Sequence, residues 1–282
     1  MTVKYSSGIG RPLNFKYPTN RAIIYIVLSS LILGILAKLV ADESFKASIV
    51  WALRFSAVLF LTWAIAREFD PDSNTSAFIS IIFILIAILL FKLPALLPLF
   101  WLLLITRILN RITGITPKPL DLTGVIILAI FISWQELWVF GLLTSLVLFV
   151  NSWMDDEKKK GTLLFIIVIT PILVLLFIPG DEYLIKTELP TEIIIAVAAF
   201  TTLIIPVIYT TNSLNTLTDI TNVPISVSRL RAARLTALVT VIIVVIMQGD
   251  NGFYNLLPIW MVILAVSIVH YRRLISHHIK DN

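Results

Sequence analysis

The chain has 282 residues, of which 58% are hydrophobic and 14% are charged, with 22 Lys and Arg against 17 Asp and Glu. Charged residues make up about a quarter of an ordinary soluble domain, so the composition excludes a disordered chain, a coiled coil and a typical soluble enzyme. Cysteine is absent, which excludes disulfides, zinc–thiolate sites and a cysteine nucleophile. The composition predicts an all-α integral membrane protein.

Apolar stretches of membrane-spanning length are found along the whole chain. A helix that crosses the hydrocarbon core needs about 20 predominantly apolar residues. The stretches that meet or approach this length cover residues 22–40, 47–66, 162–178, 193–209, 235–248 and 253–270. We therefore expect a cytoplasmic N-terminal segment over residues 1–20, one membrane domain over 21–271 and a cytoplasmic tail over 272–282.

Two further apolar stretches, residues 77–109 and 122–150, are too long for a single straight helix. At 1.5 Å per residue, about 30 residues of helix would extend roughly 45 Å, whereas the hydrocarbon core is about 30 Å thick. Each stretch is therefore predicted to form a hairpin of two short helices. The first would turn at residues 92–94, where a proline disfavours helix at the preceding residue. The second would turn at residues 134–136, where nearby tryptophans favour the membrane–water interface.

The distribution of Lys and Arg tests this number of helices. With ten spans and a cytoplasmic N-terminus, 17 basic residues fall in inner segments, 4 fall in outer segments, and Arg54 lies within a helix. If each long stretch were one helix, 14 would be inner and 6 outer, and Lys92 would be left within the membrane. Because basic residues favour the cytoplasmic side, we expect about ten transmembrane helices with both termini cytoplasmic, in the cell (plasma) membrane.

The predicted inner loops are longer and more polar than the outer ones. We therefore expect any site outside the bilayer core to lie on the cytoplasmic face. The candidate residues for such a site are Arg67, Glu68, Asp70, Asp72, Asn110, Arg111, Asp219, Arg229, Arg231 and Arg234.

The acidic candidates lie around a proline. Asp70 and Asp72 are two residues apart, and two carboxylates in this arrangement could share a Mg²⁺ ion. The alternative is a turn in which Asp72, Ser73 or Asn74 caps the next helix. An Asp-Pro-Asp turn alone is weak evidence for a metal, so no metal site and no cofactor are predicted.

The basic candidates favour phosphate or anionic lipid. Arg107 and Arg111 are four residues apart, so the two share a helix face. The same holds for Arg231 and Arg234, which are three residues apart. Planar guanidinium groups bind phosphate through paired hydrogen bonds, which indicates an anion pocket. Alternatively, these residues only attract the anionic lipids of the inner leaflet. The charged run at residues 155–160 is interpreted as a solvated signal for topology.

Arg54 and Glu136 are the ionisable residues nearest the membrane interior. Ionisable groups within a membrane are candidates for function and usually have a partner. Both fall toward the outer side in the ten-span topology, so we predict that they pair. The alternative is that Arg54 extends its side chain to the outer interface.

No HExxH, Walker A or GxSxG motif and no Rossmann glycine fingerprint is present in the sequence. Ten helices allow two five-helix halves of opposite orientation, which is the architecture of many secondary transporters. We therefore expect a small secondary transporter or permease. The alternatives are a membrane enzyme or a binder of a lipid-linked phosphate with a cytoplasmic-face site, and a structural or assembly subunit. The expected partners are the lipid bilayer, with anionic lipids at the cytoplasmic face, and a small-molecule ligand, but no nucleic acid.

Overall fold

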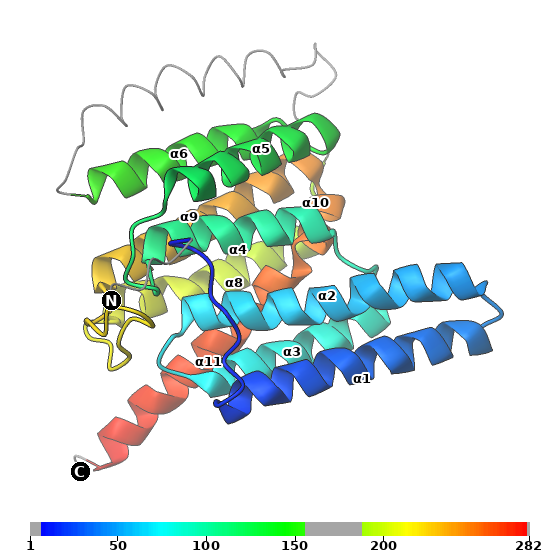
Figure 1. Cartoon of the computed structure of the whole chain (residues 1–282), viewed down its shortest axis with the longest axis horizontal. Helices are drawn as coiled ribbons and strands as arrows, with labels where there is room; N and C mark the ends of the chain where they lie inside the picture. Colours follow the sequence, from blue (N-terminus) through cyan, green and yellow to red (C-terminus); the bar gives the residue numbers. More distant parts are fainter. Residues whose placement is uncertain (1–6, 156–187, 281–282) are drawn as a thin grey trace, which may run out of the picture. The chain divides into compact units, whose positions relative to one another are not determined.

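The computed structural model describes residues 7–155 and 188–280, with side chains described as far as residue 276. In this part of the chain the regular structure is entirely helical (Figure 1). The helices are α1 (Pro18–Val40), α2 (Phe45–Phe69), α3 (Asn74–Leu90), α4 (Leu96–Asn110), α5 (Pro119–Gln135), α6 (Val139–Trp153), α8 (Thr191–Thr210), α9 (Val227–Gln248), α10 (Asp250–Asn255) and α11 (Leu257–Lys280).

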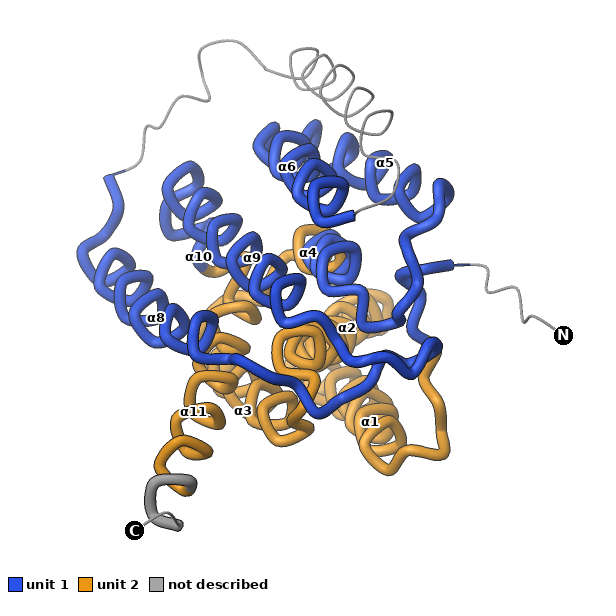
Figure 2. The backbone as a smooth tube through the Cα atoms, turned by 90° about the vertical axis from the view of Figure 1, so that its left-hand side faces the viewer, with its two compact units in different colours: residues 1–11, 101–253 blue, residues 12–100, 254–282 orange. Residues whose placement is uncertain are grey.

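The chain divides into two compact units, coloured separately in Figure 2. Unit 1 takes the residues up to 11 and residues 101–253, and unit 2 takes residues 12–100 and 254–282. Unit 1 therefore holds most of α4 together with α5, α6, α8 and α9, and unit 2 holds α1, α2, α3 and α11. The prediction of one membrane domain over residues 21–271 concerns placement in the bilayer, and it stays a prediction.

Unit 2 is built around α2, which packs against α1, α3 and α11. Small residues line the contact between α1 and α2. A Cβ atom on Gly34 would lie 3.1 Å from the Cβ of Ala52, and the hydroxyls of Ser30 and Ser56 are hydrogen-bonded at 2.9 Å. Small residues let apolar helices approach closely and let polar groups bond across the contact, so this pair of helices is tightly joined.

Unit 1 has α5 and α6 side by side, with α9 packed against both α6 and α8 (Figure 1). Trp101 anchors α4 on α6. Its Nε1 donates a hydrogen bond to Thr144 Oγ1 at 2.9 Å, and its ring meets Phe140 edge to face at 5.0 Å. Both aromatic rings are fully buried. Paired aromatic rings of this kind stabilise a core beyond their buried area, so α4 and α6 are held together near the middle of α4.

Both long apolar stretches are divided into two helices, as predicted. The first divides between Leu90 and Leu96, around the proline, and the second between Gln135 and Val139. The second break contains neither Gly nor Pro. There the Ser133 hydroxyl of α5 accepts a hydrogen bond from the backbone N–H of Gly141 at 2.8 Å. The same N–H also lies 3.1 Å from the carbonyl oxygen of Trp138, so the Ser133 hydroxyl is a second acceptor that joins the end of α5 to the start of α6.

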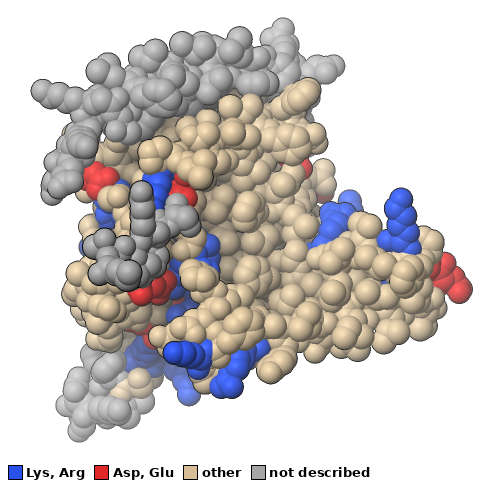
Figure 3. All heavy atoms as spheres, in the orientation of Figure 1, with Lys and Arg blue, Asp and Glu red and all other residues tan. Residues whose placement is uncertain are grey.

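Five of the described helices are long and apolar enough to cross a membrane, namely α1, α2, α8, α9 and residues 257–276 of α11. The predicted span at 162–178 lies outside the described residues. Leu33, Val40 and Leu89 are among many large apolar side chains that are mostly exposed. Figure 3 shows that Lys, Arg, Asp and Glu side chains take up only a small part of the visible surface of the described residues. Soluble proteins rarely expose apolar surface so extensively, which is consistent with a membrane protein.

Candidate functional site

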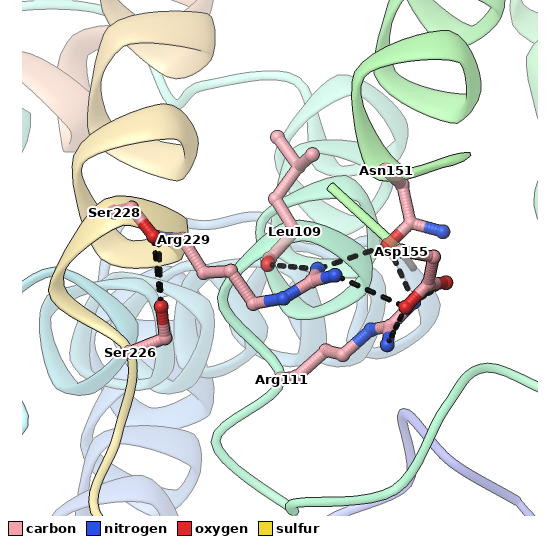
Figure 4. A network of polar contacts seen from close by, with 7 residues as sticks. All are labelled: Leu109, Arg111, Asn151, Asp155, Ser226, Ser228 and Arg229. Atoms are coloured by element: carbon pink, nitrogen blue, oxygen red, sulfur yellow. Dashed lines mark hydrogen bonds and ion pairs between the residues drawn. The ribbon is translucent and has the colours of Figure 1, made fainter. Parts of the chain in front are cut away.

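A network of polar side chains joins the ends of three helices in unit 1 (Figure 4). Arg111 directly follows α4, Asp155 lies two residues beyond the end of α6, and Arg229 is in the first turn of α9. The Nη1 atom of Arg111 lies 2.6 Å from Oδ1 of Asp155, and its Nη2 contacts Oδ2. The Nη2 atom of Arg229 lies 3.3 Å from the same Oδ1. One carboxylate therefore binds two guanidinium groups.

Neutral acceptors complete the network. Asn151, in the last turn of α6, accepts hydrogen bonds on its Oδ1 from Arg111 at 3.0 Å and from Arg229 at 3.2 Å. Arg229 also donates to the backbone carbonyl of Leu109, near the end of α4, at 3.2 Å. These bonds fix the ends of α4, α6 and α9 to one another, and they orient both guanidinium groups toward Asp155.

The network is largely buried and is not neutral. The side chains of Arg111 and Arg229 are only 12% and 11% exposed, and that of Asp155 is 28% exposed. Two positive charges thus meet a single carboxylate among the described residues, which leaves a net charge of about +1. Charges removed from water are costly unless they are paired. This surplus makes the network a candidate site for an anion.

The local backbone around Arg111 is unusual. Arg111 has a φ of 50°, in the left-handed region, and its buried Nε has no hydrogen-bond partner among the described residues. Asn110 stabilises the turn, because its side-chain oxygen accepts the backbone N–H of Ile112 at 3.3 Å. Strained backbone conformations of non-glycine residues persist where the surroundings enforce them, and they concentrate at functional sites. The conformation of Arg111 therefore adds to the case for a site here.

Arg231 and Arg234 do not bind Asp155 but hold the C-terminal end of α8. Arg231 Nη2 donates to the carbonyls of Tyr209 at 2.9 Å and Thr211 at 2.7 Å. Arg234 Nη1 lies 2.9 Å from the hydroxyl of Thr211. The last carbonyls of a helix have no helical partner, and cations near them are favourable. These two arginines therefore join α9 to α8.

Asp219 belongs to a separate contact with the start of the chain. Arg11 Nε lies 2.7 Å from a carboxylate oxygen of Asp219. Upstream in the same segment, Ser7 Oγ and the Gly8 N–H bind the two carboxylate oxygens of Asp121 at 2.6 and 2.7 Å. Residues 7–11, which we call the N-terminal strap, are thus fastened to two predicted inner loops of unit 1.

The acidic candidates lie in unit 2. Arg67 and Glu68 are in the last turn of α2, because that helix continues to Phe69, and Glu68 is fully buried. Arg67 donates to Asn74 Oδ1 at 2.5 Å. Asp72, in the turn that follows, is half-buried. The candidates of the predicted inner loops are therefore divided between the two units.

Asp70 ends α2 and pairs with an arginine from α11. Both of its carboxylate oxygens lie 3.4 Å from the guanidinium of Arg273. The predicted cap is confirmed at Ser73, whose hydroxyl accepts the backbone N–H of Thr75 and of Ser76. Within the described part of the chain, no group of three or more Asp, Glu or His side chains is placed to hold a metal ion. The hydrogen bonds of Ser73 therefore match the capping interpretation of the turn.

Arg54 and Glu136 lie in different units. Arg54 is exposed on α2 of unit 2, and Glu136 is half-buried directly after α5 of unit 1. Their pairing stays a prediction.

The sequence indicated the two arginines of the network but not their acceptors. The interpretation of the charged run at residues 155–160 as solvated is wrong for Asp155, because its carboxylate binds Arg111 and Arg229. The available signal was a carboxylate directly after a predicted helix, on the predicted inner side of the membrane, where most arginines were also expected. Asn151 gave no signal at all.

In comparisons with family models, curated proteins and solved structures, nothing matches the chain.

Proposed function

We propose that the chain is a multi-pass protein of the cell membrane, with about ten spans and both termini cytoplasmic, which acts as a small secondary transporter. The observation that carries this proposal is the charged network across the ends of α4, α6 and α9. Ion pairs that lock helix ends together can be broken and remade as packed elements shift between two arrangements. In this proposal, Asp155 with its two arginines closes the inner end of unit 1.

The contacts of Arg111 support the ten-span topology. Arg111 can meet Asp155 and Arg229 only if the loops at 107–121, 151–161 and 212–234 lie at the same end of unit 1. If residues 122–150 formed one spanning helix, Arg111 and Asp155 would be on opposite faces of the membrane. At 1.5 Å per residue, α5 and α6 would be about 22–26 Å long, which suits two short spans joined by a turn.

Helices α8 and α9 of unit 1 also carry covered polar groups without a hydrogen-bond partner among the described residues. The hydroxyls of Thr201 in α8 and Thr240 in α9 are buried without a hydrogen-bond partner among the described residues. Pro206, inside α8, lacks the N–H that would bond to the carbonyl four residues earlier. Unsatisfied groups at membrane depth are costly and are available to water or to a passing solute. Both features therefore favour a polar route through unit 1.

The topology is testable by cysteine labelling, because the natural chain has no cysteine. Single variants Thr116→Cys and Ser213→Cys fall in the proposed inner loops, and Glu43→Cys and Asn251→Cys fall in outer turns. All four positions are exposed. In intact cells, a membrane-impermeant maleimide should label the outer pair only, and permeabilised cells should show labelling of all four. Labelling of Thr116→Cys in intact cells would contradict the ten-span topology.

Transport is testable in liposomes that contain the purified full chain. We expect saturable uptake of at least one radiolabelled anion from a panel of inorganic phosphate, glycerol phosphate and succinate, above the uptake of protein-free liposomes. Arg111→Ala should lower this uptake about tenfold or more, because it removes the two-pronged ion pair with Asp155. Arg111→Lys, which keeps the charge, should retain more activity. Uptake indistinguishable from protein-free liposomes for the whole panel would refute transport of these anions.

A second candidate function is the binding of a lipid-linked phosphate at the cytoplasmic face. The observation that favours it is the surplus of positive charge where Arg111 and Arg229 share one carboxylate, since guanidinium groups bind phosphate well. A protein of this kind would bind phosphate-bearing lipid without moving any soluble anion across the liposome membrane.

A further inference from the structure

We propose that Asp155 occupies a binding site for a phosphate dianion, and that the ligand enters by replacing this carboxylate between Arg111 and Arg229. The inference rests on the proposed function, because it names the substrate class of that same network. In the structure the Asp155 carboxylate then occupies the position of the ligand, and the ligand can bind only after this carboxylate has left the two arginines.

The donors around Asp155 already have the arrangement that an oxyanion needs. Both terminal nitrogens of Arg111 reach the carboxylate, one to each oxygen, and Arg229 approaches the same group from α9 (Figure 4). The Nε of Arg111 is a further donor, buried and without a partner among the described residues. A tetrahedral phosphate presents more acceptor oxygens than a carboxylate, so it could use donors that Asp155 leaves unused.

Charge favours a dianion over a second carboxylate. Among the described residues, the network with Asp155 in place keeps a surplus of about one positive charge, and a monoanionic ligand that replaced Asp155 would leave the same surplus. A phosphate group carries nearly two negative charges near neutral pH and would balance both guanidinium groups. Because uncompensated buried charge is costly, the exchange is favourable for a dianion and close to neutral for a carboxylate.

The frame of the site would remain when Asp155 leaves. Asn151 holds both guanidinium groups from within α6, and Leu109 holds Arg229 from α4. Asp155 itself lies beyond the end of α6, is the most exposed charged member of the network, and its carboxylate has no other partner among the described residues. The arginines are therefore preorganised, and the carboxylate is the part that can move away. Preorganisation of this kind lowers the cost of binding.

The test compares three versions of the purified full chain in detergent micelles: the natural chain, Asp155→Asn and Glu43→Gln. Inorganic phosphate is the probe, acetate is the monoanion control, and both are titrated at about pH 8 while Tm and Kd are measured. Glu43→Gln removes the same charge from an exposed pair whose atoms lie 3.9 Å apart. We expect Asp155→Asn to bind phosphate about tenfold more tightly than the natural chain, because one charge-assisted competitor is gone. Glu43→Gln should match the natural chain, and in both of these chains acetate should have little effect because it would only exchange one carboxylate for another.

A second variant guards against misfolding, and a second arm identifies the source of the phosphate. Adding Arg229→Gln to Asp155→Asn should abolish the gain in phosphate affinity. In lipid nanodiscs, phosphatidic acid at about a tenth of the lipid should raise the Tm of Asp155→Asn if the phosphate belongs to a headgroup.

A response to either probe supports the site, and a response of Asp155→Asn no greater than that of Glu43→Gln to both probes overturns it. Phosphate binding without anion uptake in liposomes would overturn transport alone, and uptake without the gain in Asp155→Asn would overturn this inference alone.

Discussion

Replacement of Asp155 by alanine is expected to lower the free energy of unfolding by roughly 2–3 kcal/mol, because it leaves two mostly buried guanidinium groups without their shared carboxylate. The expected loss is smaller than for a fully buried pair because the Asp155 side chain is 28% exposed. The measurement is the unfolding of the natural and variant chains in the same detergent, followed by tryptophan fluorescence.

The exposed pair of Lys38 and Glu43 provides the control for this prediction. The two side chains are 31% and 49% exposed, and exposed ion pairs typically contribute about 0–1 kcal/mol. Glu43→Ala should therefore leave the unfolding transition nearly unchanged. If Asp155→Ala and Glu43→Ala have equal effects, the network does not hold the ends of α4, α6 and α9 together.

Gly114→Ala is expected to destabilise the chain by roughly 1–3 kcal/mol, because the backbone of Gly114 has a positive φ that alanine adopts only with strain. Gly114 has a φ of 80°, and a Cβ atom there would lie 2.0 Å from the hydroxyl oxygen of Thr221 and 2.8 Å from that of Thr218. The added methyl group would therefore push the turn after Arg111 away from Thr218 and Thr221, in the loop that precedes α9. Thermal unfolding in detergent measures the effect.

Gly124 is the matched control for this second prediction. It lies within α5, and nothing is within 4 Å of a Cβ atom added there. Alanine is favoured over glycine inside a helix by roughly 0.5–1 kcal/mol, so Gly124→Ala should be neutral or slightly stabilising. A Gly114→Ala variant as stable as Gly124→Ala would show that the turn adapts without strain.

Features set by neighbouring residues were predictable from the sequence. Hydrophobic length predicted that the stretches 77–109 and 122–150 would each divide, and helix α3 begins after a serine cap at Ser73. Both depend on residues a few positions apart, where spacing and side-chain chemistry act directly. The same local signals identified Arg111 and Arg229 as residues of interest, since basic residues near apolar spans are conspicuous.

The partners of these arginines were not predictable in the same way. Asp155 is 44 residues from Arg111 and 74 from Arg229 along the chain. Their contact depends on how α4, α6 and α9 pack, which the period of a single helix does not specify. The sequence also leaves open which of the candidate residues contact one another, and in the structure Asp70 binds Arg273 within unit 2 while Arg111 binds Asp155 within unit 1.

The N-terminal strap has a consequence for the order in which the protein matures. Its partners Asp121 and Asp219 follow their contacts in the strap by 113 and 208 residues. Because ribosomes add about 5–20 residues per second, the strap must wait roughly 10–40 s for Asp219 to be synthesised. Although residues 7–11 are synthesised early, their contact with Asp219 can form only late in synthesis. The strap therefore cannot take its final position before the loop that precedes α9 has been synthesised.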